Sequence, residues 1–181
     1  ARVPYSSDQP GRTPRFRHSR STPMSTWTTA DIPDQSGRTA VITGANTGLG
    51  FETAKALADK GDYFVICAVR DPKKMDAKAK EVGISKNDYC AMKLELGSFQ
   101  SVKDFVFNLK AFKSERPLTH LVCNAAVYRP ADPEPAWTDD GYEMSVGVNH
   151  LGHFLLLQLH DNLNCQKLQF VQLKSGFPHP Q

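Results

Sequence analysis

The sequence predicts an α/β fold in which helices cover a parallel sheet, and two observations support this prediction. From residue 37 onward, short apolar segments alternate with segments whose apolar residues recur at helical spacing, which is typical of repeated strand–helix units. A glycine-rich turn at residues 43–50 lies where the first expected strand passes into the first expected helix. Together these features predict a doubly wound parallel sheet of the Rossmann type, which we expect to be incomplete at its C-terminal side.

Strands and helices are expected to alternate along the chain. The short apolar segments expected to form strands are residues 39–43, 63–69, 89–95 and 118–123. A further segment, residues 167–173, is compatible with a fifth strand. The segments expected to form helices are residues 49–60, 71–83, 99–112 and 141–159.

Local signals mark where several of these helices begin and end. Asp71 is a good N-cap, and Pro72 fits the first turn because its missing N–H has no partner there anyway. Gly61 and Gly83 are expected to end their helices because glycine tolerates the left-handed C-terminal conformation.

Charge and cysteine content narrow the classes of function. Five arginines and a single acid lie within residues 1–30, so the rest of the chain is close to neutral although the whole carries a formal charge of +3. Because binding to nucleic acid needs a clustered basic surface, the nearly neutral part of the chain after residue 30 argues against it. Binding or conversion of a small molecule is the better expectation. The four cysteines are widely spaced, which fits a reducing compartment, and no apolar run approaches the roughly 18 residues of a membrane span.

Composition divides the chain into three parts. Residues 1–36 are rich in Arg, Ser, Thr and Pro, a composition shared by transit peptides, disordered tails and a translated leader before Met24, and these interpretations remain open. Residues 37–160 are expected to form part of a nucleotide-binding Rossmann domain. Residues 161–181 are expected to be a divergent tail.

The turn sequence TGANTGLG at residues 43–50 is the main chemical signal. Gly44 permits a tight turn, Gly48 lets the backbone approach a pyrophosphate, and Gly50 allows close packing of strand and helix. The helix N-terminus adds amide donors and a positive dipole, so we expect a phosphate group there. The alternative is a glycine turn that binds no ligand.

These motifs resemble the short-chain dehydrogenase/reductase family. Besides the glycine turn, the sequences CNAA at residues 123–126 and VNHLGHF at residues 148–154 resemble two further family motifs. The resemblance implies that the first of these lines the ribose side of the cofactor. It also implies that Asn149 supports the proton relay by fixing a water near the catalytic lysine; otherwise Asn149 is a helix-surface amide. Glu95 and Leu96 resemble the pair that flanks adenine, and Glu95 is equally well interpreted as an ordinary strand-end carboxylate.

Arg70 ends the second expected strand, where family members that use NAD carry an acid. A guanidinium at this point suits a 2′-phosphate through bidentate, charge-assisted hydrogen bonds, so the expected cofactor is NADPH. The alternative is an arginine that only pairs with Asp71 or solvent. The residues expected to bind the cofactor are Gly44, Asn46, Thr47, Gly48, Leu49, Gly50, Arg70, Glu95, Leu96, Asn124, Ala125 and Ala126.

A narrower resemblance, carried by most of residues 63–159, is to the light-dependent protochlorophyllide reductases. It implies a plastid enzyme of chlorophyll synthesis that moves hydride from NADPH to protochlorophyllide, with association at a thylakoid or plastid membrane surface and homo-oligomers as further expectations. Two alternatives remain open. One is a cytoplasmic NADP-dependent family member that acts on a retinol- or ketone-like substrate, and the other is a non-catalytic nucleotide-binding fragment.

The catalytic tyrosine and lysine of the family are not found in their expected place. Tyr89 and Lys93 have the spacing of that pair, but they lie on an expected strand about 13 Å apart, which is too far for a shared proton relay. We therefore expect this chain alone to be inactive. His150 and His153 have no evident third ligand, so no metal site is expected, and Cys123 is expected to be a small packing residue.

Overall fold

The structure is a computed structural model that describes residue 28 and residues 37–59, 63–112, 117–129, 134–159 and 169–172. All of these except Thr28 belong to one compact unit, Pro33–Gln181. The expectations for the two terminal parts of the chain, apart from residues 28 and 169–172, lie outside the described residues. So does the expectation for Gly61.

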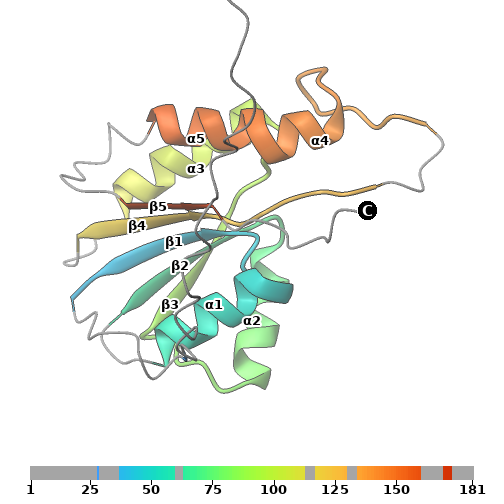
Figure 1. Ribbon diagram of the computed structural model, residues 1–181. Coiled ribbons are helices and arrows are strands. Elements are labelled where there is room, and N and C mark those ends of the chain that lie inside the picture. The colour runs from blue at the N-terminus through green and yellow to red at the C-terminus, as the bar shows by residue number, and fades with distance from the viewer. Residues whose placement is uncertain are drawn as a thin grey trace, which may run out of the picture. The chain divides into compact units, whose positions relative to one another are not determined.

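Within the described residues, five parallel strands form a single sheet in the order β3-β2-β1-β4-β5, which confirms the predicted fold class. Figure 1 shows the sheet with helices on both faces. The segment compatible with a fifth strand does pair with β4. The strands are β1 (Thr39–Thr43), β2 (Phe64–Val69), β3 (Tyr89–Lys93), β4 (Leu118–Cys123) and β5 (Gln169–Gln172).

The helices follow the predicted order, and α1, α2 and α3 begin and end within two residues of the predicted boundaries. They are α1 (Gly48–Ala58), α2 (Pro72–Glu81), α3 (Phe99–Ala111), α4 (Met144–Val146), the π-helical segment η2 (Gly147–Gly152) and α5 (His153–Leu159).

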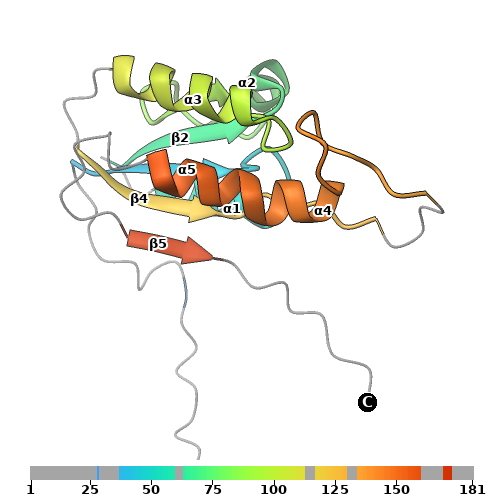
Figure 2. The same cartoon turned by 90° about the horizontal axis from the view of Figure 1, so that it is seen from above.

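The elements form three layers, with α1 and α2 on one face of the sheet and α3, α4 and α5 on the other (Figures 1 and 2). Neighbouring residues of the central strand serve opposite layers: Ala40 and Ile42 pack with α1 and α2, and Val41 packs with α3 and α5. All five residues of β1 are buried. A strand covered on both faces has few polar side chains, which explains the apolar run at residues 40–42 between Thr39 and Thr43.

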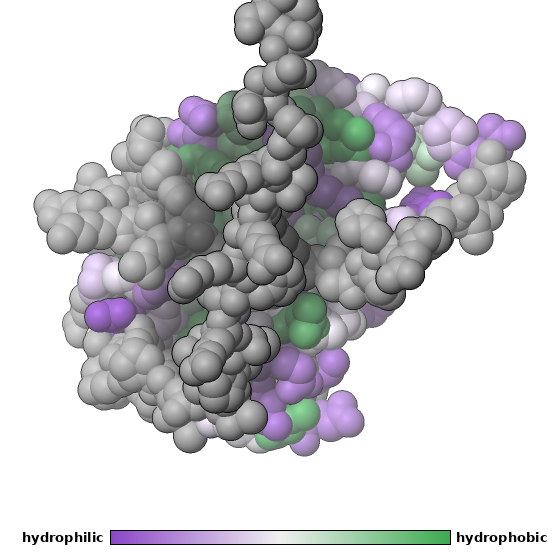
Figure 3. Space-filling view, in the orientation of Figure 1, coloured by the Kyte–Doolittle hydropathy of each residue, from purple (hydrophilic) through white to green (hydrophobic). Residues whose placement is uncertain are grey.

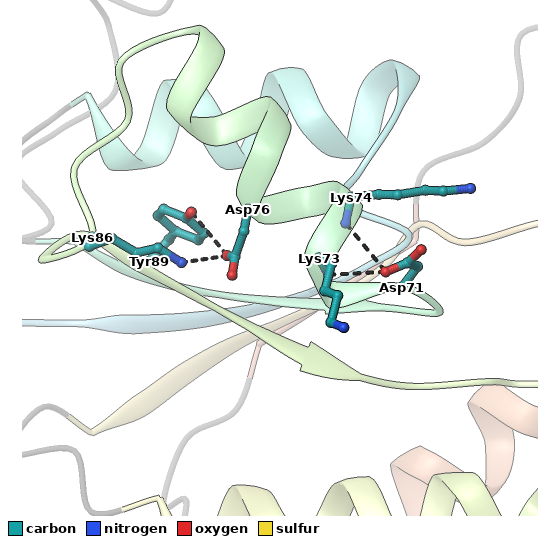
Figure 4. A network of polar contacts seen from close by, with 6 residues as sticks. All are labelled: Asp71, Lys73, Lys74, Asp76, Lys86 and Tyr89. Carbon is teal, nitrogen blue, oxygen red and sulfur yellow. Dashed lines mark hydrogen bonds and ion pairs between the residues drawn. The ribbon is translucent and has the colours of Figure 1, made fainter.

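The predicted start of α2 is confirmed in detail. Asp71 adopts an extended conformation, and its carboxylate accepts hydrogen bonds from the amides of Lys73 and Lys74 at 3.0 and 3.3 Å (Figure 4). Pro72 occupies the first helical position. Figure 3 shows hydrophilic residues gathered over α2, whose outer side therefore presents its lysines to solvent.

The last helix begins later than predicted. Gly141 has a φ of 82° and therefore stays outside the helix, and the carboxylate of Glu143 caps the new start by accepting hydrogen bonds from the amides of Ser145 and Val146, both at 2.9 Å. These two donors lower the pKa of the Glu143 carboxyl. The segment η2 then interrupts the α-helical pattern. Such π-helical turns are frequent at functional sites, and apolar periodicity does not reveal them.

We predict that Asp71→Ala lowers the free energy of unfolding by about 1 kcal/mol, because two amides at the start of α2 lose their capping acceptor. Urea denaturation followed by circular dichroism measures this change. Asp71→Asn, which keeps an acceptor oxygen, is the matched control and should lose less. Equal losses for both variants would contradict a capping role.

Candidate functional site

A cavity of about 270 Å³ opens where the strand order of the sheet reverses. The connection after β1 leads outward to β2 on one side, whereas β4 lies on the other side of β1. Ligands of doubly wound sheets bind at such a reversal, outside the carboxyl ends of the strands. The residues lining the cavity include those that follow β1, β2, β3 and β4 directly: Gly44, Asn46, Thr47, Arg70, Leu94, Glu95, Leu96, Asn124, Ala125, Ala126 and Val127.

Most of the predicted cofactor residues meet in this one cavity. Gly48, Leu49 and Gly50 are not part of its lining, and they form the first turn of α1 beside it. Sequence reasoning missed seven of the lining residues, which lie within two residues of a predicted one or on one side of the last helix. These are Thr43, Ala68, Val69, Leu94, Val127, Met144 and Val148.

The glycine turn has the geometry that its sequence predicts. Gly44 and Gly48 have φ values of 67° and 54°, a conformation that side chains disfavour. A β-carbon added to Gly48 would meet nothing within 4 Å, so the backbone there is open to an approaching group. A β-carbon on Gly50 would collide with the Asn124 amide and lie 2.5 Å from the Gly44 carbonyl oxygen. Gly50 therefore allows the close packing expected of it.

The N-terminus of α1 differs from those of α2 and α3 because no side chain caps it. Thr47 occupies the N-cap position without a capping hydrogen bond, and the first turn holds no acidic residue. In contrast, Asp71 caps α2 and Ser98 caps α3. The amides at the start of a helix need acceptors, and an anionic ligand supplies them well.

The segment that follows β4 is held by hydrogen bonds to the end of β1. The side-chain amide of Asn124 donates to the carbonyls of Thr43 and Gly44 at 2.9 and 3.4 Å. The backbone amides of Asn124 and Ala125 both donate to the Thr43 hydroxyl at 2.9 Å. Thr43 is completely buried and thereby connects two walls of the cavity.

Asn149 makes a two-point contact with this same segment. Its side-chain oxygen accepts a hydrogen bond from the amide of Val127 at 2.7 Å, and its side-chain nitrogen donates to the carbonyl of Val127 at 2.9 Å. Asn149 is thus more than a helix-surface amide, because it ties η2 to the cavity wall. The expectation that it supports a proton relay stays a prediction.

Arg70 is exposed and lines the cavity beside Asn46 and Thr47. Among the described residues Arg70 forms no ion pair with Asp71, whose carboxylate caps α2 instead. Lys78 is a second nearby cation that the sequence did not reveal. Its ammonium donates to the Asn46 carbonyl at 3.4 Å and lies 4.1 Å from the centre of the Phe51 ring.

Glu95 lines the cavity, and its carboxylate accepts a hydrogen bond from the Gly97 amide at 3.1 Å. The hydroxyl of Ser101 accepts a hydrogen bond from the backbone amide of Glu95 at 2.9 Å. These hydrogen bonds hold the segment that follows β3, and Glu95 still lines the cavity. Glu95 therefore remains open to both interpretations, an adenine-flanking residue and an ordinary strand-end carboxylate.

The tyrosine and lysine with catalytic spacing do not form a catalytic pair. Tyr89 is buried on the side of α2, where its hydroxyl donates to Asp76 at 3.1 Å and Lys86 packs over its ring (Figure 4). Neither Tyr89 nor Lys93 lines the cavity.

The histidines and cysteines near the site are engaged in packing. His153 uses both ring nitrogens for contacts with Thr43 and Asn149, and His150 stacks on Phe154. Burial raises the pKa of the Cys123 thiol to about 11, so it is protonated near neutral pH. Within the described part of the chain, no group of three potential metal ligands comes together, and no helix is long and apolar enough to cross a membrane.

A doubly wound parallel sheet with a cavity at its point of reversal defines a Rossmann-type α/β protein, and comparison with known proteins identifies its family. The sequence pattern of the short chain dehydrogenases matches residues 38–163, so the chain belongs to that family. Members of this family typically bind NAD or NADP.

Among individual proteins, the chain is 56% identical over 119 residues to a chloroplastic protochlorophyllide reductase of Cucumis sativus, a match that covers 66% of this chain and 29% of the relative. It is 53% identical over 121 residues to the chloroplastic protochlorophyllide reductase of Marchantia paleacea, covering 67% and 26%. The chain therefore spans less than a third of the length of these relatives. The citronellol catabolism dehydrogenase of Pseudomonas aeruginosa PAO1 superposes with a TM-score of 0.59 at 26% identity, over 76% of this chain and 55% of that one.

We predict that Gly50→Ala destabilises the protein by about 1–3 kcal/mol, because the new methyl group must displace Asn124 or the backbone of Gly44. Urea unfolding measures the change. Gly97→Ala is the matched control, because neither Gly50 nor Gly97 has a positive φ and a β-carbon on Gly97 would make only ordinary contacts of 3.4 Å or more. A Gly50→Ala variant as stable as Gly97→Ala would contradict the close approach of strand and helix.

Proposed function

We propose that this chain is the NADPH-binding part of a light-dependent protochlorophyllide reductase. The observation that carries the proposal is the uncapped N-terminus of α1 beside a cavity lined by Arg70. Identity of 53–56% to two plant reductases supports this particular substrate over a retinol- or ketone-like one.

The residues of the cavity fit NADPH. The first turn of α1 offers amides without a capping side chain, and the open space over Gly48 lets a pyrophosphate come close to the backbone. Arg70 presents a guanidinium that no ion pair within the described residues occupies, which suits the 2′-phosphate. NADPH, when bound, would supply a hydride. Asn124, Ala125 and Ala126 would hold its ribose side against the end of β4.

The proposed substrate and location follow from the relatives. Both reductases named above are chloroplastic, so we place the protein in plastids. Contact with a plastid membrane surface and assembly of several copies are part of the same proposal. Among the described residues no tyrosine–lysine pair faces the cavity, so we expect the 181-residue chain to bind NADPH without turnover.

We predict that Arg70→Ala weakens binding of NADPH about 10- to 100-fold and leaves binding of NADH within a few-fold, because a charge-assisted hydrogen bond contributes about 1.5–3 kcal/mol. Isothermal calorimetry with both nucleotides measures the two affinities. Lys73→Ala, which removes an exposed cation of α2, is the control. Equal losses for both nucleotides would contradict a role in selecting the phosphorylated form.

The substrate is tested by adding protochlorophyllide to the purified chain with NADPH in the dark. The proposal predicts a red shift of pigment fluorescence that depends on NADPH. A control titration uses all-trans-retinol. Binding of retinol without any shift of protochlorophyllide fluorescence would favour the alternative substrate class. Binding of NADPH without binding of either compound would favour a nucleotide-binding fragment.

A further inference from the structure

We propose that His153, kept neutral with its proton on Nδ1, is a positioning residue that holds the cofactor-binding segment 124–127 against the end of β1. This inference rests on the proposed nucleotide function and concerns a residue that is not part of the cavity lining. It follows from counting the hydrogen bonds of a single buried hydroxyl, that of Thr43.

The Thr43 hydroxyl has one proton to donate and two lone pairs to accept with. The backbone amides of Asn124 and Ala125 are obligatory donors, and both lie 2.9 Å from this oxygen. They occupy both lone pairs. The hydroxyl must therefore donate its own proton, and its neighbours are His153 Nε2 at 2.9 Å and the Val122 carbonyl at 3.4 Å.

This arrangement determines the protonation state of His153. A proton on Nε2 would point at an oxygen without a free lone pair, so Nε2 must be the acceptor. The imidazole proton then lies on Nδ1, which is 3.3 Å from the Asn149 carbonyl and can donate to it. Both ring nitrogens are satisfied only in this neutral tautomer.

His153 thereby joins the two contacts that hold the segment. Through Thr43 it orients the acceptor for the amides of Asn124 and Ala125. Through the Asn149 carbonyl it steadies the residue whose side chain pairs with the backbone of Val127 at 2.7 and 2.9 Å. Asn124, Ala125, Ala126 and Val127 all line the cavity.

The surroundings of His153 favour the neutral form. His153 is 6% exposed, and burial lowers its pKa below the ordinary 6.5, against a smaller opposing effect of the carbonyls of Asn149 and Val148. Among the described residues, no charged side chain contributes to this shift. The ionisable groups on the elements packed nearby are Cys123 and His120 of β4, His150 of η2, and Lys103, Asp104 and Lys110 on the exposed side of α3.

Protonation of His153 should loosen the segment. Because folding lowers the pKa of His153, the neutral ring contributes fully to the free energy of unfolding above pH 6.5, where His153 is neutral in the unfolded state too. This contribution is lost as the pH falls from there through the folded-state pKa. Affinity for NADPH should fall over the same range. The 2′-phosphate of NADPH also takes up a proton at about pH 6, which weakens binding in every variant, so the effect of His153 is the part of the acid dependence that a non-titrating side chain at residue 153 removes.

The test compares the full chain with three variants. His153→Gln can still accept from Thr43 and donate to Asn149 but does not titrate, whereas His153→Leu does neither. His150→Gln is the matched control, because His150 is an exposed histidine of the same helical region. Calorimetry measures NADPH affinity between about pH 5.5 and 8, and hydrogen exchange measures protection of the peptide spanning 122–128 without nucleotide.

We expect His153→Leu to bind NADPH about tenfold more weakly at every pH, the factor expected from losing a buried hydrogen bond, and to exchange faster in this peptide. His153→Gln should keep both properties at pH 8 and show a smaller acid dependence than the unmodified chain and His150→Gln. Unchanged protection in His153→Leu, or an acid dependence as large in His153→Gln as in the unmodified chain, would overturn the proposal.

Nucleotide binding and segment positioning are separable in this design. If the unmodified chain fails to bind NADPH at pH 8, the proposed function fails, and the exchange comparison still decides whether His153 holds the segment.

Discussion

The close approach between the glycine turn and the segment after β4 determines the rest of the site. Asn124 lies against Gly50 and donates to the carbonyls of Thr43 and Gly44, so any side chain at residue 50 would push the two strand ends apart. With that contact in place, the start of α1, the end of β4 and the end of β2 surround one cavity. The fold thus brings together amides, a cation and an apolar wall from residues far apart in the sequence.

The two faces of the cavity are stabilised in different ways. The turn at residues 44–50 takes its shape from glycine conformations, whereas segment 124–127 depends on side chains from β1 and η2 that satisfy its backbone amides. Thr43 precedes the turn and contacts segment 124–127 through two groups. Its carbonyl accepts a hydrogen bond from the Asn124 side chain, and its hydroxyl accepts from the backbone amides of Asn124 and Ala125. Buried polar networks of this kind specify one arrangement, since each unpaired member would be costly.

The sequence predicts the fold well because its strands and helices have strong, regular patterns. Asp71 and Pro72 mark the start of α2, and the apolar residues of β1 alternate between two helical layers. The meeting of most expected cofactor residues in one cavity was predictable because the turn and the CNAA motif lie directly after strands. What escaped prediction depends on contacts between distant residues: Lys78 reaches Asn46, His153 reaches Thr43, and the π-helical segment interrupts a regular apolar pattern. None of these leaves a periodic signal in the chain.

The most direct test of the central claim is a titration of the ¹⁵N-labelled chain with NADPH, followed by amide chemical shifts. Binding at the first turn of α1 predicts that the amides of Asn46, Thr47, Gly48 and Leu49 shift most, together with those of Asn124 and Ala125. Shifts confined to other parts of a well-folded protein, or none at all, would contradict the account.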